Sequence, residues 1–309
     1  MGSRSRPTLS EVLDDSVSTL LWPRAALMQL ADPAVAQTEI DSGGYGNRAW
    51  HRWSRTIEYM RMTAALDDDA MAALVREVNR IHSTIRVPED ADGAPVKSAA
   101  GRRPAFDPTF QVWVAATWCV SMLDVYQLLV APIDDDVLDV LVADFARVGT
   151  TLQMRLEDWP RSHAALRQFV AEGESRYPSP LPWAGPDDPP ETVRAGDVGM
   201  QVFTTYSHKR RVVRQMPRIR LLTWGMAGPA LRAAYSLEWT DGHQRRFERE
   251  VVSRRRARAL RPAFWRRREG RAQRRRALDR LAAQETISYS ELKARERRQR
   301  RTEARMPVE

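Results

Sequence analysis

One segment restricts the fold more than any other: the 24 residues from Phe110 to Ile133 carry a single formal charge, Asp124. A helix of this length and apolarity is long enough to cross a bilayer. However, a carboxylate in mid-span is costly in hydrocarbon, and the rest of the chain has the pattern of a water-soluble domain. We therefore expect a central helix that is buried on all sides by other helices.

Apolar residues elsewhere recur at helical spacing, and no segment shows a convincing alternation of apolar and polar residues. Two amphipathic helices are expected between residues 47 and 86, separated by the acidic residues 67–69. Their apolar faces are Trp50, Trp53, Ile57, Met60 and Ala64 in the first, and Met71, Leu74, Val75, Val78, Ile81 and Ile85 in the second. The fold class is therefore mainly α, with loops expected at residues 88–106 and in the proline-rich stretch 175–197.

The positive charge is concentrated at the C-terminal end. Residues 244–309 carry 23 Lys and Arg against 9 Asp and Glu, whereas the preceding residues are net acidic. Arginine triplets at 254–256, 266–268 and 274–276 could bind nucleic acid or an anionic membrane, because clustered guanidinium groups attract phosphates. No recognition motif accompanies them, so a solvated Arg-rich extension, helical or disordered, is favoured over either partner.

Cysteine usage and the N-terminal residues bear on the compartment. The single cysteine, Cys119, excludes an intramolecular disulfide and a zinc or iron-sulfur site built on several thiolates. It falls in the most apolar helix, which predicts a buried core thiol. Glu11, Asp14 and Asp15 interrupt the stretch where a signal peptide would be apolar, so we expect a cytoplasmic location.

Several common catalytic patterns are missing from the sequence. The five histidines include no pair spaced to bind one metal from one helix, and no Glu-x-x-His motif supports a diiron centre. Residues 44–49 fit a loose dinucleotide-binding pattern, G-x-G-x-x-A, but no strand precedes them. Neither a P-loop nor a G-x-S-x-G motif is present.

Two polar features remain unusual for amphipathic helices. His82 lies on the apolar stripe of its helix, where an aliphatic residue would normally point into the core. By position alone, a core histidine bonded to a carbonyl or to Asp124 is favoured over a metal ligand. Arg52, Thr56 and Tyr59 share one face of the preceding helix, which could bind a carboxylate or a propionate or could simply be solvated.

The sequence resembles a known family, the haem-dependent oxygenases grouped around MpaB and the catalytic domain of the latex clearing protein, a rubber oxygenase. The matching stretches occur in family order and cover roughly residues 17–265: PRAALMQLADPAVA, RWSRTIEYM, VNRIHSTIRV, AFDPTFQVWVAAT and LLTWGMAGPALRAAYSLEW, followed by Phe247. The resemblance implies an N-terminal arm at residues 1–16, a single haem-binding helical domain at 17–265 and a basic tail at 266–309.

The resemblance also implies roles for individual residues. The family motif Arg-x-x-x-Thr, followed by a helical His, is similar to Arg52, Thr56 and His82. His82 then becomes the expected proximal ligand of a b-type haem, with Arg52 and Thr56 close to the cofactor. Arg55 matches the position of a distal basic residue and is the candidate catalytic residue. One imidazole with an open pocket opposite suffices for a pentacoordinate haem iron.

Two positions depart from the family pattern. Asp32 precedes Pro33 where many members have His, and Ala115 stands where many read Trp-Val-His-Ala-Thr. Neither is the expected haem ligand, so these departures bear on the reaction rather than on haem binding.

The resemblance implies an oxygenase or peroxygenase-type enzyme that oxidises a small apolar or aromatic substrate with dioxygen or peroxide. Two other hypotheses stay open: a haem-binding sensor or carrier without catalysis, and a binding protein that uses its basic tail on nucleic acid or an anionic membrane. No motif identifies the substrate, and nothing in the sequence specifies an oligomeric state.

Overall fold

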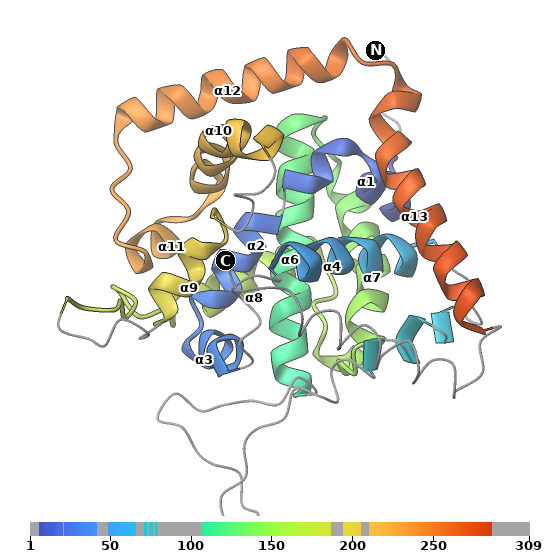
Figure 1. The fold of residues 1–309 in the computed structure, drawn as a ribbon, viewed down its shortest axis with the longest axis horizontal. Helices are drawn as coiled ribbons and strands as arrows, with labels where there is room; N and C mark the ends of the chain where they lie inside the picture. The colour runs from blue at the N-terminus through green and yellow to red at the C-terminus, as the bar shows by residue number, and fades with distance from the viewer. Residues whose placement is uncertain are drawn as a thin grey trace, which may run out of the picture.

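The computed structural model describes residues 6–20, 22–41, 49–65, 71–72, 74–76, 78–79, 107–186, 194–204 and 210–285. Within these ranges every regular element is a helix, which confirms a mainly α single domain (Figure 1). The named helices are α1 (Leu9–Asp14), η1 (Ser16–Leu20), α2 (Trp22–Leu30), α3 (Pro33–Asp41), α4 (Ala49–Thr63), α6 (Pro108–Leu129), α7 (Asp135–Thr150), η2 (Leu156–Asp158), α8 (His163–Glu174), α9 (Ala195–Gln201), α10 (Arg210–Met226), α11 (Pro229–Ala234), α12 (Asp241–Ala259) and α13 (Ala263–Glu285).

Helix α6 is the centre of the fold. Its N-cap is Asp107, whose Oδ1 accepts hydrogen bonds from the backbone N–H of Thr109 and Phe110, and Pro108 occupies the first turn. Helices α2, α7, α8 and η1 surround it, and α12 crosses one end (Figure 1). It is long and apolar enough to cross a membrane by composition, but 72% of its most apolar window is buried inside the protein. The predicted central helix, buried by its neighbours, is confirmed.

The one charge on this helix is neutralised by two arginines. Asp124 accepts a hydrogen bond of 2.6 Å from Arg24 of α2 and two of 2.8 and 2.9 Å from Arg167 of α8. Buried carboxylates are tolerated when they are paired in this way. Asp124 therefore joins three helices, and its partners account for it without His82.

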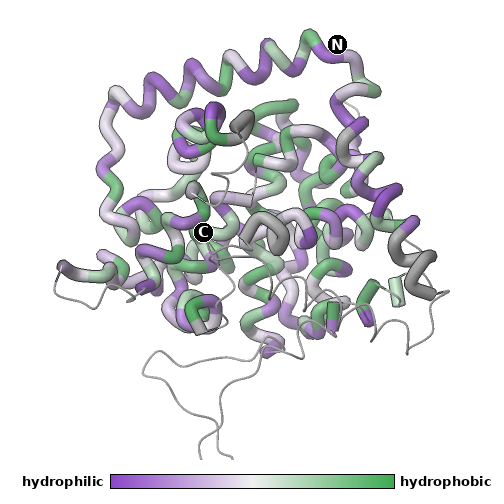
Figure 2. Tube along the Cα trace, viewed as in Figure 1, coloured by the Kyte–Doolittle hydropathy of each residue, from purple (hydrophilic) through white to green (hydrophobic). Residues whose placement is uncertain are grey.

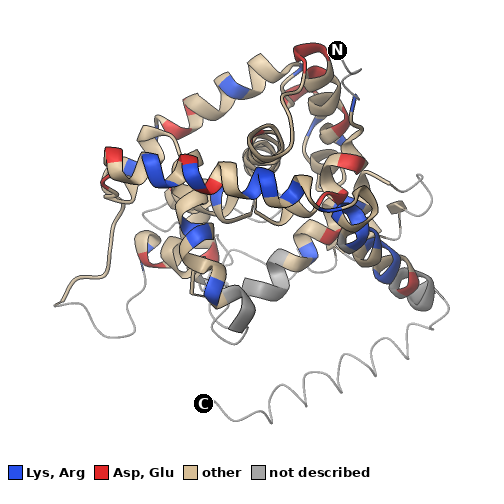
Figure 3. Ribbon diagram, turned by 90° about the horizontal axis from the view of Figure 1, so that it is seen from above, with Lys and Arg blue, Asp and Glu red and all other residues tan. Residues whose placement is uncertain are grey.

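The basic helices α12 and α13 form an L-shaped arm around the core (Figures 1 and 3). Helix α12 is mostly hydrophilic along its length, in contrast to the helices beneath it (Figure 2). The expected border between residues 265 and 266 falls inside α13. Where the domain ends along the chain stays a prediction, but the helix that crosses this border packs against α1 and α4.

Acidic residues of the N-terminal segment fix this arm to the core. Ion pairs join Glu11 to Arg267 (2.6 Å), Asp14 to Arg274 (3.0 Å) and Asp15 to Arg258 (2.6 Å). The backbones also approach closely, because a Cβ on Gly270 would lie 2.6 Å from the Asp14 carbonyl oxygen. Only glycine allows this contact. Residues 266–285 belong to helix α13, which packs against α1.

Candidate functional site

Helix α4 carries three of the four predicted site residues, namely Arg52, Arg55 and Thr56. Arg52, Thr56 and Tyr59 share one face by helical spacing. Tyr59 shows where this face is directed: it is buried, and its hydroxyl donates to the Val148 carbonyl (3.0 Å) and hydrogen-bonds Thr151. The predicted polar face therefore turns toward the C-terminal end of α7. Thr56 is half-buried, and the side chain of Arg52 lies outside the described atoms.

Tyr59 is a structural anchor of this face. Burial raises the pKa of its hydroxyl to about 12, and the hydrogen bonds with Thr151 and Thr63 offset only part of that rise. The phenol therefore stays protonated at ordinary pH and keeps donating to α7. Arg55, the predicted catalytic residue, lies on the same helix with its side chain exposed to solvent.

His82 lies outside the described residues, so its role as a ligand stays a prediction. The helical residues before it are described in part, and they follow the predicted stripe. Met71 and Leu74 are buried in the core, and Val75 and Val78 are partly buried against it. The face that carries position 82 by helical spacing is therefore the core-facing one as far as the structure describes it.

Two observations on the described residues bear on the cofactor. No group of three or more His, Cys, Asp or Glu side chains that could hold an ion occurs among them. A haem brings four nitrogen ligands of its own and needs only one protein imidazole. The Oδ1 atom of Asn79 is buried with no hydrogen-bond partner in the described part of the chain. Asn79 lies three residues before His82 in the sequence, and His82 itself is outside the described residues.

Both departures from the family pattern have structural roles. Asp32 caps α3, since its Oδ1 accepts hydrogen bonds from the backbone N–H of Ala34 (2.9 Å) and Val35 (3.3 Å). Ala115 is buried where α6 packs on α7. A Cβ added to Gly149 of α7 would lie only 3.3 Å from the Cβ of Ala115. The small residues Ala115 and Gly149 therefore face each other in this close contact between α6 and α7.

Two of the five histidines have described side chains, and both lie in the first turn of a helix. His243 caps α12 together with Thr240 and stacks on Trp239. His163 begins α8, and its Nε2 is buried without a hydrogen-bond partner among the described residues. Burial, followed by the nearby Arg167, lowers the pKa of His163. Cys119 is fully buried as predicted, and burial raises the pKa of its thiol well above the usual value.

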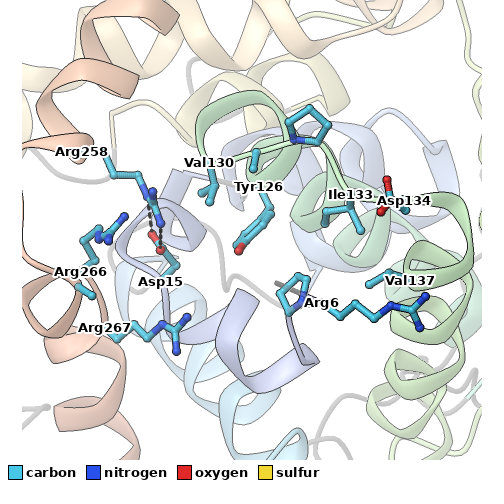
Figure 4. Close-up of a pocket in the computed structure, with 14 residues that line it drawn as sticks. Arg6, Asp15, Tyr126, Val130, Ile133, Asp134, Val137, Arg258, Arg266 and Arg267 are labelled. Atoms are coloured by element: carbon cyan, nitrogen blue, oxygen red, sulfur yellow. Dashed lines mark hydrogen bonds and ion pairs between the residues drawn. The ribbon is translucent and has the colours of Figure 1, made fainter. Parts of the chain in front are cut away.

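The sequence analysis missed a pocket at the corner where α12 meets α13 (Figure 4). Its volume is about 320 Å³, and none of the predicted site residues lines it. The lining comes from three distant parts of the chain: Arg6, Pro7, Asp15, Tyr126, Val130, Ala131, Pro132, Ile133, Asp134, Val137, Arg258, Ala263, Arg266 and Arg267. The arginine triplet at 266–268 was a signal of this site, but nothing in the sequence placed Tyr126 next to it.

Comparison with known proteins decides the family. Residues 10–261 match the family model described as "ER-bound oxygenase mpaB/B'/Rubber oxygenase, catalytic domain". The chain belongs to this family. The match includes Arg52, Arg55, Thr56 and His82, and it confirms the resemblance that the sequence motifs indicated. Membership of a family of oxygenases indicates that the protein is an oxygenase.

Two mycobacterial proteins are similar over most of the MpaB/rubber oxygenase domain. They are titled "Uncharacterized protein Mb2261" from Mycobacterium bovis and "Uncharacterized protein Rv2237" from Mycobacterium tuberculosis. Each is 30% identical over 235 residues, which cover 74% of this chain and 84% of the relative. No solved structure matches the chain significantly.

Proposed function

We propose that the protein is a haem b-dependent oxygenase, or a peroxygenase-type oxidoreductase, that acts on a small apolar or aromatic substrate. The observation that carries the proposal is the family match across residues 10–261, which includes the whole Arg-x-x-x-Thr and helical His pattern. The burial of Met71 and Leu74 supports it, because a ligand on that stripe would point into the core. The substrate class and the choice of dioxygen or peroxide rest on the resemblance alone.

In this proposal the residues have separate roles. His82 would hold the iron, and Arg52 and Thr56 would bind groups at the haem edge, where a guanidinium and a hydroxyl one turn apart can hold a carboxylate. A bound haem would supply the activation of the oxidant. Tyr59, hydrogen-bonded to α7, would keep this face of α4 in place. The distal role of Arg55 rests on the resemblance, and its exposed side chain would place it at the open side of the site.

An absorption spectrum of the full chain supplied with haem tests the cofactor. We expect a Soret band in the parent, and its loss or displacement in His82→Ala. His243→Ala is the matched control, because His243 lies in the capping turn of α12 and not on the stripe. Equal haem content in the two variants would remove His82 from the proposal, and no Soret band in the parent would remove the haem.

A second pair of variants separates catalysis from haem storage. Arg52→Ala should lower haem occupancy, whereas Arg55→Ala should keep the haem and weaken cyanide or oxygen binding about tenfold. A hydrogen bond from a charged donor is worth about 1.5–3 kcal/mol, which corresponds to that factor or more. If Arg55→Ala matches the parent in ligand affinity and oxidation rate, another group must serve the distal side. A haem carrier without activity would bind haem normally but turn over no substrate with either oxidant.

A further inference from the structure

Three large apolar side chains are exposed together where α12 meets α13. Leu260, Phe264 and Trp265 are 85, 58 and 50% exposed, although they lie within six residues of one another. The rings of Phe264 and Trp265 are 5.4 Å apart between centroids, so they form one continuous apolar surface. We call Leu260, Phe264 and Trp265 the corner patch. Clustered apolar exposure of this kind marks an interaction surface, whereas a single exposed leucine does not.

Two arginines beside the corner patch, Arg261 and Arg266, have no side-chain partner in the part of the chain that the structure describes. The side chains of Arg261 and Arg266 make no hydrogen bond or ion pair with the described residues, whereas Arg258 and Arg267 are paired with N-terminal carboxylates. Arg268 lies over the Trp265 ring, with its Cζ atom 4.6 Å from the centroid. The surface therefore combines exposed apolar rings with positive charge that nothing in the described protein neutralises.

The pocket at the corner contains groups that can bind one anion. Arg266 and Tyr126 both line it, and the Tyr126 side chain extends into the space between the α13 arginines and the opposite wall (Figure 4). Tyr126 is nine-tenths buried, and its hydroxyl has no hydrogen-bond partner among the described residues. The carboxylate of Asp15, which also lines the pocket, is already paired with Arg258. Asp134 lies on the far wall (Figure 4).

This combination of groups matches the chemistry of a phospholipid. A guanidinium and a phenol O–H donor suit a phosphate, which offers several acceptor oxygens to both. Aromatic and leucine side chains next to arginines are the arrangement by which peripheral proteins enter the headgroup region of an anionic bilayer.

We propose that the α12–α13 corner binds the surface of an anionic membrane, with the corner patch inserted among the lipids and Arg261 and Arg266 on their phosphates. Nucleic acid is the weaker match, because a phosphate backbone gives no reason for three exposed apolar side chains at the contact. The proposal goes beyond the oxygenase function, since no residue of α4 or of the segment 71–79 lines the pocket.

Co-flotation of the full chain with vesicles tests the proposal. We expect binding to vesicles of 30% phosphatidylglycerol in phosphatidylcholine, and at least tenfold weaker partitioning to pure phosphatidylcholine. Leu260→Ser combined with Trp265→Ser should lower partitioning to the anionic vesicles about tenfold. Arg266→Gln combined with Tyr126→Phe should lower this partitioning several-fold, because these groups bind the lipid phosphate and not the acyl chains.

Two matched controls lie on the same fold. Leu156→Ser changes another exposed leucine (63% exposed) away from the corner, and Arg275→Gln changes an exposed arginine of α13 that does not line the pocket. Both should partition like the parent, and all variants should unfold at the same urea concentration.

Three results would overturn the proposal. The first is equal partitioning of the patch variant and the Leu156 control. The second is tighter binding to a double-stranded DNA oligomer that the patch variant leaves unchanged, which would identify nucleic acid as the partner. The third is a parent that binds neither kind of vesicle and forms an oligomer, together with a patch variant that is monomeric. That result would identify the corner as a contact between copies of the chain.

Discussion

Arg61 is the charged side chain whose removal should destabilise the protein most. It lies on α4 and is 1% exposed, and its guanidinium donates hydrogen bonds to the Leu13 carbonyl (2.8 Å), the Ser18 hydroxyl (2.9 Å) and the side-chain oxygen of Gln273. These partners belong to α1, η1 and α13. One guanidinium therefore connects the predicted site helix to the N-terminal segment and to the C-terminal arm.

The expected change in the free energy of unfolding follows from two opposing contributions. The variant used is Arg61→Met, because methionine keeps most of the side-chain volume. Three hydrogen bonds from a charged donor contribute about 4.5–9 kcal/mol in total, at about 1.5–3 kcal/mol each. Removing the charge also removes the cost of burying it, which is several kcal/mol. The Leu13 carbonyl keeps a hydrogen bond from Ser18, so it is not left unsatisfied. We expect a net loss of about 2–4 kcal/mol in the free energy of unfolding.

The pH dependence gives this prediction a second readout. Burial raises the pKa of Asp14, and Arg274 and Arg61 hold it down in part. Without Arg61 the folded-state pKa of Asp14 rises further, so its carboxylate costs more stability above that pKa. Below it, Asp14 is protonated and needs no cation. The deficit of Arg61→Met should therefore be larger at pH 7 than at pH 4.

Urea unfolding followed by circular dichroism measures the effect. Arg275→Met, a change of the same kind on the exposed side of α13, should stay within about 0.5 kcal/mol of the parent. Gln273→Ala should cost less than Arg61→Met, and the double variant should cost less than the two losses added, because both remove one shared bond. A deficit below about 1 kcal/mol, or full additivity, would refute the reasoning.

Two further predictions concern the arm and His163. Truncation after Pro262 removes α13 and its contacts with α1, so the urea midpoint should fall clearly below that of a chain truncated after Glu285; equal midpoints would mean that α13 contributes nothing to the core. Burial lowers the pKa of His163, so the unfolded chain binds a proton at this residue more readily than the folded chain does. The stability that the neutral, buried imidazole contributes is therefore complete above pH 6.5 and declines as the pH falls. His163→Gln should flatten the stability profile below pH 6.5, and an unchanged profile would show that the imidazole titrates normally.

Local patterns were enough to predict much of the fold. The long apolar segment predicted a central helix. Helical periodicity reports burial directly, so the spacing of Met71, Leu74, Val75 and Val78 predicted the buried side of another. The sequence also singled out Asp124 as the exception on α6. It could not name the partners Arg24 and Arg167, since neither lies near it in the chain.

The packing of the arm was not predictable for the same reason. Residues 266–285 contain few large apolar residues, so the sequence predicts a solvated extension, either helical or disordered. What holds them is Gly270 against the Asp14 backbone, Ala277 in the core and ion pairs to Glu11 and Asp14. Small residues and long-range charge pairs leave no periodic signal. The site was predicted only where a family motif named residues, and its central residue, His82, stays a prediction.

The closure of α13 onto α1 has a consequence for synthesis. The acids of α1 leave the ribosome first, and their arginine partners follow about 250 residues later. Until then Arg61 lacks the bond to Gln273, and α1 lacks the helix that covers it. A ribosome-bound chain that ends before residue 263 should therefore be open to protease at its N-terminal segment. The last described helix would determine when the first one becomes protected.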